Sequence, residues 1–199
     1  MKRLALLFFA GAAPALFAQS FEAGMSFGES VLSNAVLQDS SATLGSTSSR
    51  ISLKDGFRFG FRIGVNTTKY MGFEVGYAYN RSQFHQDGPP PSDQGMAIHQ
   101  GFGDGLIYAT KEGSRIRPFA AGGLQFSNFV PPGSSVSSGG GQTKFGFNYG
   151  AGVKVKVAEN WLIRFDFRQY ESGIPDFNVF SPHGRLFQNE ISAGFAFAL

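Results

Sequence analysis

The chain contains 199 residues, of which 17 are basic, 14 acidic, 27 glycine and 23 phenylalanine. This length suits a single domain with a sizeable core. The absence of cysteine excludes disulfides, thiolate metal sites, cysteine nucleophiles and a lipid-modified N-terminal cysteine. Two of the basic residues, Lys2 and Arg3, belong to a predicted leader, so the rest of the chain is too nearly neutral to indicate nucleic-acid binding.

Residues 1–18 have the features of a cleaved export signal. Lys2 and Arg3 precede an apolar stretch that is shorter than the ~20 residues of a membrane-spanning helix, and small residues follow it. We expect cleavage after Ala18, with Ala15 as the alternative site. A buried N-terminal helix would need one polar face, which this stretch lacks. The sequence thus predicts a signal peptide at 1–18 and one mature domain at 19–199.

Eight later segments alternate apolar residues with small or polar ones at a period of two, which is typical of β-strands. In the four clearest, which begin at Phe57, Met71, Phe145 and Trp161, no odd-numbered position carries a charge. The predicted strands lie at 21–27, 57–65, 71–80, 96–110, 117–129, 145–157, 161–168 and 187–199.

Two of these segments are less regular. Residues 96–110 carry bulky apolar side chains at even positions, the face that we expect to be the apolar outer one, although Gln100 and Asp104 share it. Residues 117–129 are apolar at both parities, which is consistent with a β-bulge or with a wrong strand assignment. The apolar residues at even positions of 96–110 are Met96, Ile98, Phe102, Leu106 and Tyr108.

The connections between the predicted strands alternate between long and short. An up-and-down antiparallel meander has this pattern, with both chain termini at the end of the short turns. The long connections span 31–50, 82–95, 130–141 and 171–186, and the short turns span 66–69, 111–114 and 158–160. No second domain is indicated.

Three features favour a barrel whose apolar face meets lipid. The opposite face is rich in glycine, which weakens a water-exposed strand but leaves room inside a narrow barrel. The strands are long enough for a tilted crossing of the hydrocarbon layer. Aromatic residues fall near the expected membrane boundaries, with Tyr77 and Tyr79 at the long-connection end and Tyr108, Trp161 and Phe197 at the short-turn end. The predicted fold is an all-β, eight-stranded antiparallel up-and-down transmembrane β-barrel.

A soluble lipocalin-like periplasmic carrier is the alternative eight-stranded barrel. Alternation alone does not distinguish the two barrels, because only the direction of the apolar face differs. A carrier would need a roomy apolar interior, and the Gly-x-Trp start typical of lipocalins is missing. The only tryptophan, Trp161, lies in the seventh predicted strand.

The pattern over 19–199 resembles the small eight-stranded outer-membrane barrels of Gram-negative bacteria, the family of the outer-membrane protein A transmembrane domain. Its most specific part, Phe187 to Leu199, is similar to the C-terminal signal read by the barrel-assembly machinery. The family usually ends on an aromatic residue, whereas this chain ends on Leu199 with Phe197 two residues earlier. The resemblance implies export to the outer membrane, assembly by that machinery, and contact with outer-membrane lipids and lipopolysaccharide.

Charged residues on the small-residue face would point into the barrel. Because buried charges need partners, we predict a salt-bridge network across the lumen. Such a network could line a gated ion path, or it could fill and brace the barrel, and the narrow bore of eight strands favours the second. The predicted network comprises Arg62, Glu74, Arg164, Asp166, Arg168 and Glu190. Arg58 and Lys154 share this face.

No set of residues indicates catalysis, a cofactor or a strong metal site. His85 and His183 lie in predicted long connections, and His99 enters a strand without the serine two residues later that a deacylase-like barrel would have. Asp87 and Asp93 could hold at most a weakly bound Ca²⁺.

We expect a structural or surface-interaction protein, serving adhesion or envelope integrity, whose long connections bind any ligand. A narrow ion pore and a lipid-modifying enzyme are the alternatives.

Overall fold

The chain forms a closed β-barrel in the computed structural model, which describes residues 20–33, 36–40, 49–87, 91–131, 133–134, 141–175 and 184–199. The predicted leader at 1–18, His183 and parts of the long connections lie outside these residues. In the part of the chain that is described, no helix has the length and hydrophobicity needed to cross a membrane.

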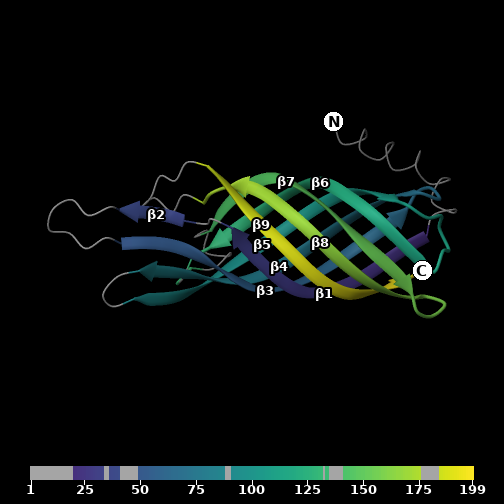
Figure 1. Cartoon of the computed structure of the whole chain (residues 1–199), viewed down its shortest axis with the longest axis horizontal. Helices are drawn as coiled ribbons and strands as arrows, with labels where there is room; N and C mark the ends of the chain where they lie inside the picture. The colour runs from purple at the N-terminus through teal and green to yellow at the C-terminus, as the bar shows by residue number, and fades with distance from the viewer. Residues whose placement is uncertain are drawn as a thin grey trace, which may run out of the picture.

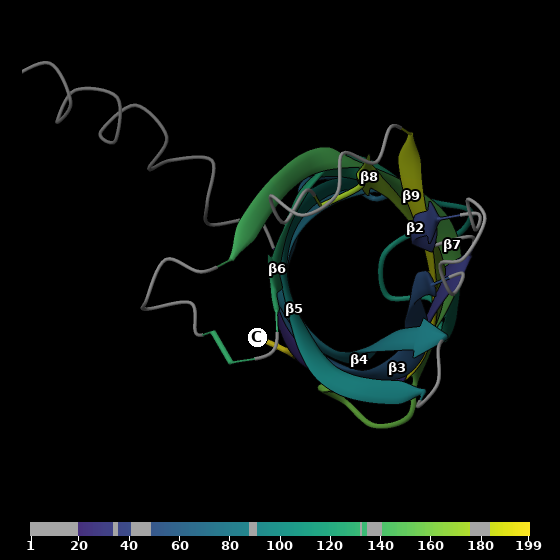
Figure 2. The same ribbon diagram turned by 90° about the vertical axis from the view of Figure 1, so that its left-hand side faces the viewer.

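Nine strands pair antiparallel in one sheet (Figure 1). They are β1 (Ser20–Ser33), β2 (Val36–Ser40), β3 (Ser49–Asn66), β4 (Met71–Asp87), β5 (Ser92–Tyr108), β6 (Ile116–Val130), β7 (Gln142–Lys156), β8 (Trp161–Gly173) and β9 (Arg185–Ala198). Eight of them form the barrel, which closes because β1 pairs with both β3 and β9. Figure 2 shows these strands as a ring. The short β2 pairs with the far end of β3.

Alternate side chains point out of the barrel and into it, as the period of two predicts. Phe57, Phe73 and Phe165, on three different strands, are 56, 55 and 50% exposed. Charged side chains at the opposite parity, such as Arg58 and Glu74, are buried. The predicted barrel is therefore confirmed, and a lipocalin-like carrier, which keeps its apolar face inside, is wrong for this chain.

The outer face predicted for β5 is wrong. Its even positions, including Asp104 and Tyr108, point into the lumen, and glycine occupies several of the outward positions. The pairing with β4 decides this, because Asp104 lies opposite Glu74, which also points inward. The outward Gly101 lies opposite Phe126 of β6, whose ring takes the space that a side chain at Gly101 would need. Tyr108 therefore does not belong to an outer girdle.

The next strand, β6, is regular and contains no bulge. Its pairing with both β5 and β7 runs without a register shift between Phe119 and Phe129. These two phenylalanines point inward and are buried, whereas Leu124 and Phe126 point outward and are exposed. Apolar residues occur at both parities because the lumen itself contains apolar clusters at the heights of Phe119 and Phe129.

The lumen holds three layers of buried side chains. One apolar cluster lies at the long-connection end, a smaller one lies toward the short turns, and charged residues lie between them. The first cluster comprises Leu32, Leu53, Met96, Ile98, Phe129 and Leu186, and the second comprises Leu106, Tyr108, Phe119 and Ala121. The bore is thus occupied by side chains at several heights.

Three strands, β3, β4 and β5, continue past the rest of the barrel at the long-connection end (Figure 1). They contain 18, 17 and 17 residues, against 13 in β8. The pairing of β4 with β5 begins at Gln86 and Ser92, whereas β5 pairs with β6 only from Ala97 onward. The prediction that 82–95 forms a loop is therefore wrong for most of its length. Both faces of a strand outside the membrane meet water, so this segment lacks the apolar alternation that predicts strands.

Candidate functional site

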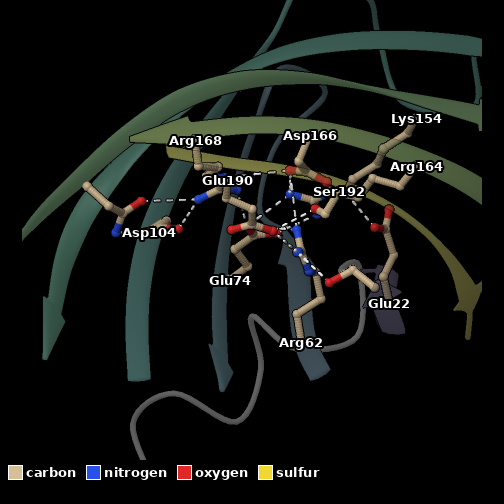
Figure 3. Close-up of polar contacts among 12 residues, drawn as sticks. Glu22, Arg62, Glu74, Asp104, Lys154, Arg164, Asp166, Arg168, Glu190 and Ser192 are labelled. Carbon is tan, nitrogen blue, oxygen red and sulfur yellow. Dashed lines mark hydrogen bonds and ion pairs between the residues drawn. The ribbon is translucent and has the colours of Figure 1, made fainter. Parts of the chain in front are cut away.

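The six residues of the predicted network meet in the middle layer of the lumen (Figure 3). They are Arg62 on β3, Glu74 on β4, Arg164, Asp166 and Arg168 on β8, and Glu190 on β9, and all six side chains are buried. In the ring of eight strands, β4 and β8 lie on opposite sides. Contacts between these two strands therefore cross the lumen.

Glu74 is the acceptor that joins the two sides. Arg164 donates from Nη1 to Oε2 at 2.6 Å and from Nη2 to Oε1 at 3.0 Å, which makes a two-pronged contact across the lumen. Arg168 donates from Nη2 to Oε1 at 2.5 Å, and Arg62 Nη1 lies 3.9 Å from the same oxygen. Charge-assisted bonds of this geometry are strong, and burial makes the loss of one partner costly. Glu74 thus ties three cations from β3 and β8 to β4.

The other charges of this layer are compensated within it. Arg164 donates to Asp166 from Nε and from Nη2, both at 2.8 Å, and Arg62 donates to the same carboxylate at 3.2 Å. Arg168 also donates to Asp104 of β5. Every arginine here therefore meets at least two carboxylates, which offsets the cost of burying its charge.

A second group of contacts extends the network toward the long-connection end. Arg58 Nε lies 3.0 Å from Glu190, and Arg58 Nη2 donates to the Tyr170 hydroxyl at 3.0 Å. Tyr170 in turn donates to Glu190 at 2.8 Å, and Arg58 also donates to Gln100. Glu190 is joined to the middle layer by Arg62, whose Nη2 lies 3.8 Å away.

Four members of the network are absent from the predicted set. Arg58 is at least expected on the inner face, whereas Asp104, Gln100 and Tyr170 are not. Asp104 and Gln100 are missed because the even face of β5 is expected to point outward. Their own polarity is the signal that identifies them, since a charge facing lipid destabilises a barrel most near the middle of the bilayer. Tyr170 carries no comparable signal, because a tyrosine suits either face of a strand near the membrane boundary.

Four of the five predicted girdle residues lie on the outer wall, at opposite ends of the apolar band. At the long-connection end, Tyr77 and Tyr79 flank His99, and the Tyr77 hydroxyl lies 2.5 Å from its Nδ1. At the short-turn end, the rings of Trp161 and Phe197 lie 5.2 Å apart in an edge-on contact.

Tyr108 is the fifth predicted girdle residue, and it lies inside the barrel. It is 4% exposed, its hydroxyl accepts a hydrogen bond from Lys154 Nζ at 2.8 Å, and the guanidinium of Arg117 stacks on its ring. Lys154 also pairs with Glu22 of β1. These residues form a separate polar group at the short-turn mouth of the lumen.

His85 lies between two carboxylates on the extension of β4 and β5. Its Nδ1 is 2.5 Å from Asp93 and its Nε2 is 2.8 Å from Asp87, while Lys54 Nζ lies 3.1 Å from both Asp93 oxygens. The hydrogen bonds from His85 and then Lys54 lower the pKa of Asp93 below its ordinary value. The two aspartates proposed for Ca²⁺ are thus engaged by side chains. No cluster of three or more His, Asp or Glu in the described ranges is arranged to hold a metal ion.

Comparison with known proteins identifies the family. The family model described as outer membrane protein beta-barrel domain matches residues 4–197. The chain belongs to this family. Its fold is similar to OprG from Pseudomonas aeruginosa, with a TM-score of 0.65, 11% identity, and coverage of 90% of this chain and 95% of OprG. No curated protein sequence matches the chain.

Two further solved structures have the same architecture. AlkL, determined by solid-state NMR in lipid bilayers, gives a TM-score of 0.59 at 12% identity and covers 90% of both chains. Neisserial surface protein A gives 0.56 at 17% identity, covering 90% of this chain and 96% of that one. At these identities the likeness shows the fold alone.

The protein is an integral barrel of the outer membrane of a Gram-negative bacterium, and its resemblance to the small eight-stranded barrels is confirmed. In such barrels the short turns face the periplasm and the longer connections face outward. The extension of β3, β4 and β5 therefore projects from the cell surface, and the mouth at Tyr108 faces the periplasm.

Proposed function

We propose that this protein is a closed outer-membrane scaffold with a structural or surface-interaction role, which neither conducts ions nor catalyses a reaction. The contact of Glu74 with Arg164 carries this proposal, because it crosses the lumen from β4 to β8. An ion passing through so narrow a bore would have to break these bonds. The apolar cluster around Ile98 and Phe129 adds a second barrier on the extracellular side.

The projecting extension supports a role at the cell surface. Its strands are paired, and contacts among Lys54, His85 and Asp93 hold charged side chains in defined positions outside the membrane. A preformed surface loses little conformational freedom when it binds a partner. We propose that ligand contacts lie in this extension, which contains most of 82–95, and in the connections predicted at 31–50, 130–141 and 171–186.

Planar-bilayer recording tests the closed lumen. We expect the wild-type barrel to produce no stepwise conductance, because its bore is filled. The matched variants are Arg164→Gln, within the ionic layer, and Arg185→Gln, on the outer wall. A regular wild-type conductance that changes in Arg164→Gln but not in Arg185→Gln would demonstrate a narrow ion pore and overturn the proposal.

Lipopolysaccharide is the proposed partner of the outer wall. Arg81 points outward on β4, two residues beyond Tyr79, and beside a cavity of 290 Å³. Its side chain makes no ion pair or hydrogen bond with the residues that the structure describes. A free guanidinium at the membrane boundary suits the phosphate groups of this lipid. Arg185 also points outward but is paired with Glu171 at 3.1 Å.

This difference provides a matched test of lipid binding. We expect Arg81→Gln to reduce the lipopolysaccharide that copurifies with the barrel, measured by native mass spectrometry, and Arg185→Gln to leave it nearly unchanged. Equal retention by both variants would contradict a specific contact at Arg81.

The barrel-assembly machinery is the proposed partner during biogenesis. Recognition would use β9, whose outward residues Phe195 and Phe197 pack against Trp161 of β8. Phe197→Ala should reduce the fraction of folded barrel in cells, measured by the heat-dependent shift on gels, more than it reduces unaided refolding in detergent. An equal reduction in both would indicate a loss of packing only.

A further inference from the structure

Among the described residues, the lumen contains one more buried cation than buried carboxylates. The buried cations are Arg58, Arg62, Arg117, Lys154, Arg164 and Arg168, and the buried inward carboxylates are Glu22, Glu74, Asp104, Asp166 and Glu190. Five of the six cations have a carboxylate oxygen within 4.0 Å. Among the residues that the structure describes, Arg117 has none. The uncompensated charge of the lumen therefore lies at one identifiable residue.

The residues around Arg117 accept only some of the hydrogen bonds that its guanidinium can donate. Arg117 is 5% exposed, and its guanidinium carbon lies 3.7 Å from the centre of the Tyr108 ring. Its Nη1 donates a long hydrogen bond of 3.4 Å to Asn66 Oδ1. Nε and Nη2 have no hydrogen-bond partner within the described part of the chain. These two atoms share one edge of the guanidinium, the fork that binds two oxygens of a carboxylate or phosphate.

A cavity lies beside this residue at the periplasmic mouth. Its volume is 150 Å³, and Arg117, Lys154, Asn66 and Ser114 contribute to its lining. Three carboxylates line it as well: Glu22 is occupied by Lys154, Glu112 accepts from Ser20, and Glu159 is exposed. Figure 3 shows the contact between Lys154 and Glu22 beside Arg164, at one side of the layer around Glu74. A water occupies about 30 Å³ in the liquid, so the cavity has room for a small oxyanion with some of its hydration.

We propose that this cavity binds a small oxyanion from the periplasm, a phosphate or a carboxylate, with Arg117 as its principal ligand. The Nε and Nη2 atoms are buried, so the guanidinium must rotate before these two donors can face the cavity. This rotation breaks the long hydrogen bond from Nη1 to Asn66. Binding compensates the one unpaired buried cation, which is the source of the affinity. The Lys154 ammonium adds a second positive charge at the cavity wall.

The test compares barrel stability in different anions. The barrel is refolded in detergent, and its thermal unfolding is followed in rising inorganic phosphate or acetate at constant ionic strength. We expect the wild-type melting temperature to rise with one or both anions, because a ligand that binds only the folded state stabilises it. The more effective anion identifies the preferred chemistry. Arg117→Gln should abolish the rise.

Two controls keep the test decisive. In buffer without these oxyanions, Arg117→Gln should be as stable as the wild type or more stable, since it removes an unpaired buried charge. Arg164→Gln should be less stable in every buffer but keep the rise. If Arg117→Gln fails to fold, broadening of the phosphate ³¹P signal by wild-type barrel provides a second measurement. A wild-type melting temperature that ignores both anions, or a rise retained in Arg117→Gln, would overturn the proposal.

Discussion

The middle of the lumen and its periplasmic mouth contain the same kinds of side chain but treat buried charge differently. In the middle, Arg164 and Arg168 share Glu74, and each also meets an aspartate. At the mouth, Arg117 is equally buried but has an aromatic ring and one amide oxygen as its partners. Burial alone therefore does not reveal the role of a charge. A compensated charge braces the barrel, whereas an uncompensated one is available for a ligand.

The largest effect is expected where compensation is most complete. Glu74→Ala leaves Arg164 and Arg168 without their shared carboxylate, and breaking a buried pair in this way costs about 3–5 kcal/mol. The free energy of unfolding in urea measures the loss. Ser192→Ala, which removes a neutral donor to the charged Glu190, is the control and should cost about 1.5–3 kcal/mol, the range for a hydrogen bond to a charged group. A loss below that control would show that the ionic layer does not brace the barrel.

A charge introduced on the lipid-facing side of the barrel would have no carboxylate partner, unlike the charges in the middle of the lumen. Phe165 is half exposed on the lipid-facing side of β8. Phe165→Arg should destabilise the barrel by about 2–4 kcal/mol if the site lies near the middle of the bilayer. Refolding into lipid vesicles measures this cost, and Phe165→Leu is the apolar control. Equal stability of the two variants would count against lipid contact at this position.

A smaller effect is expected from a neutral change at the mouth. Tyr108→Phe removes the hydroxyl that accepts from Lys154 but keeps the ring under Arg117. The donor is a charged ammonium, and the loss of one such hydrogen bond costs about 1.5–3 kcal/mol. Urea unfolding measures the change, and the response of the barrel to oxyanions should persist. A loss as large as that of Glu74→Ala would mean that both regions brace the barrel equally.

The smallest effect concerns the extension, where charges are exposed. The pKa of Asp93 is held below its ordinary 3.8 by His85 and Lys54. These contacts therefore stabilise the extension above that pH, and their contribution is lost as the pH falls through the lowered value. NMR titration should show that His85→Gln returns the pKa of Asp93 toward 3.8, with barrel signals unchanged. An identical Asp93 titration in both proteins would contradict this account.

The sequence by itself determined the class of fold and the surroundings of most charges. Alternation at a period of two separates the two faces of each strand, and the charge-free odd positions of the segments that begin at Phe57 and Phe145 leave one direction for the apolar face in a membrane. The side chains of Arg62, Glu74 and Arg164 then had to point inward. Closure of the tilted strands into a barrel brought these side chains together, because the bore of an eight-stranded barrel is narrow.

Only the tertiary structure decided the orientation of β5 and the partners of individual charges. Alternation defines two faces but does not say which one is inside when one is apolar and the other is mostly glycine. The polarity of Gln100 and Asp104 favours the even face as the inner one, and the pairing of Asp104 with Glu74 decides it. Whether a carboxylate lies beside Arg117 along the barrel axis depends on the stagger between strands that are far apart in the sequence. No local sequence pattern predicts that stagger. The paired extension beyond the membrane also required the structure, because water on both faces removes the alternation that would predict it.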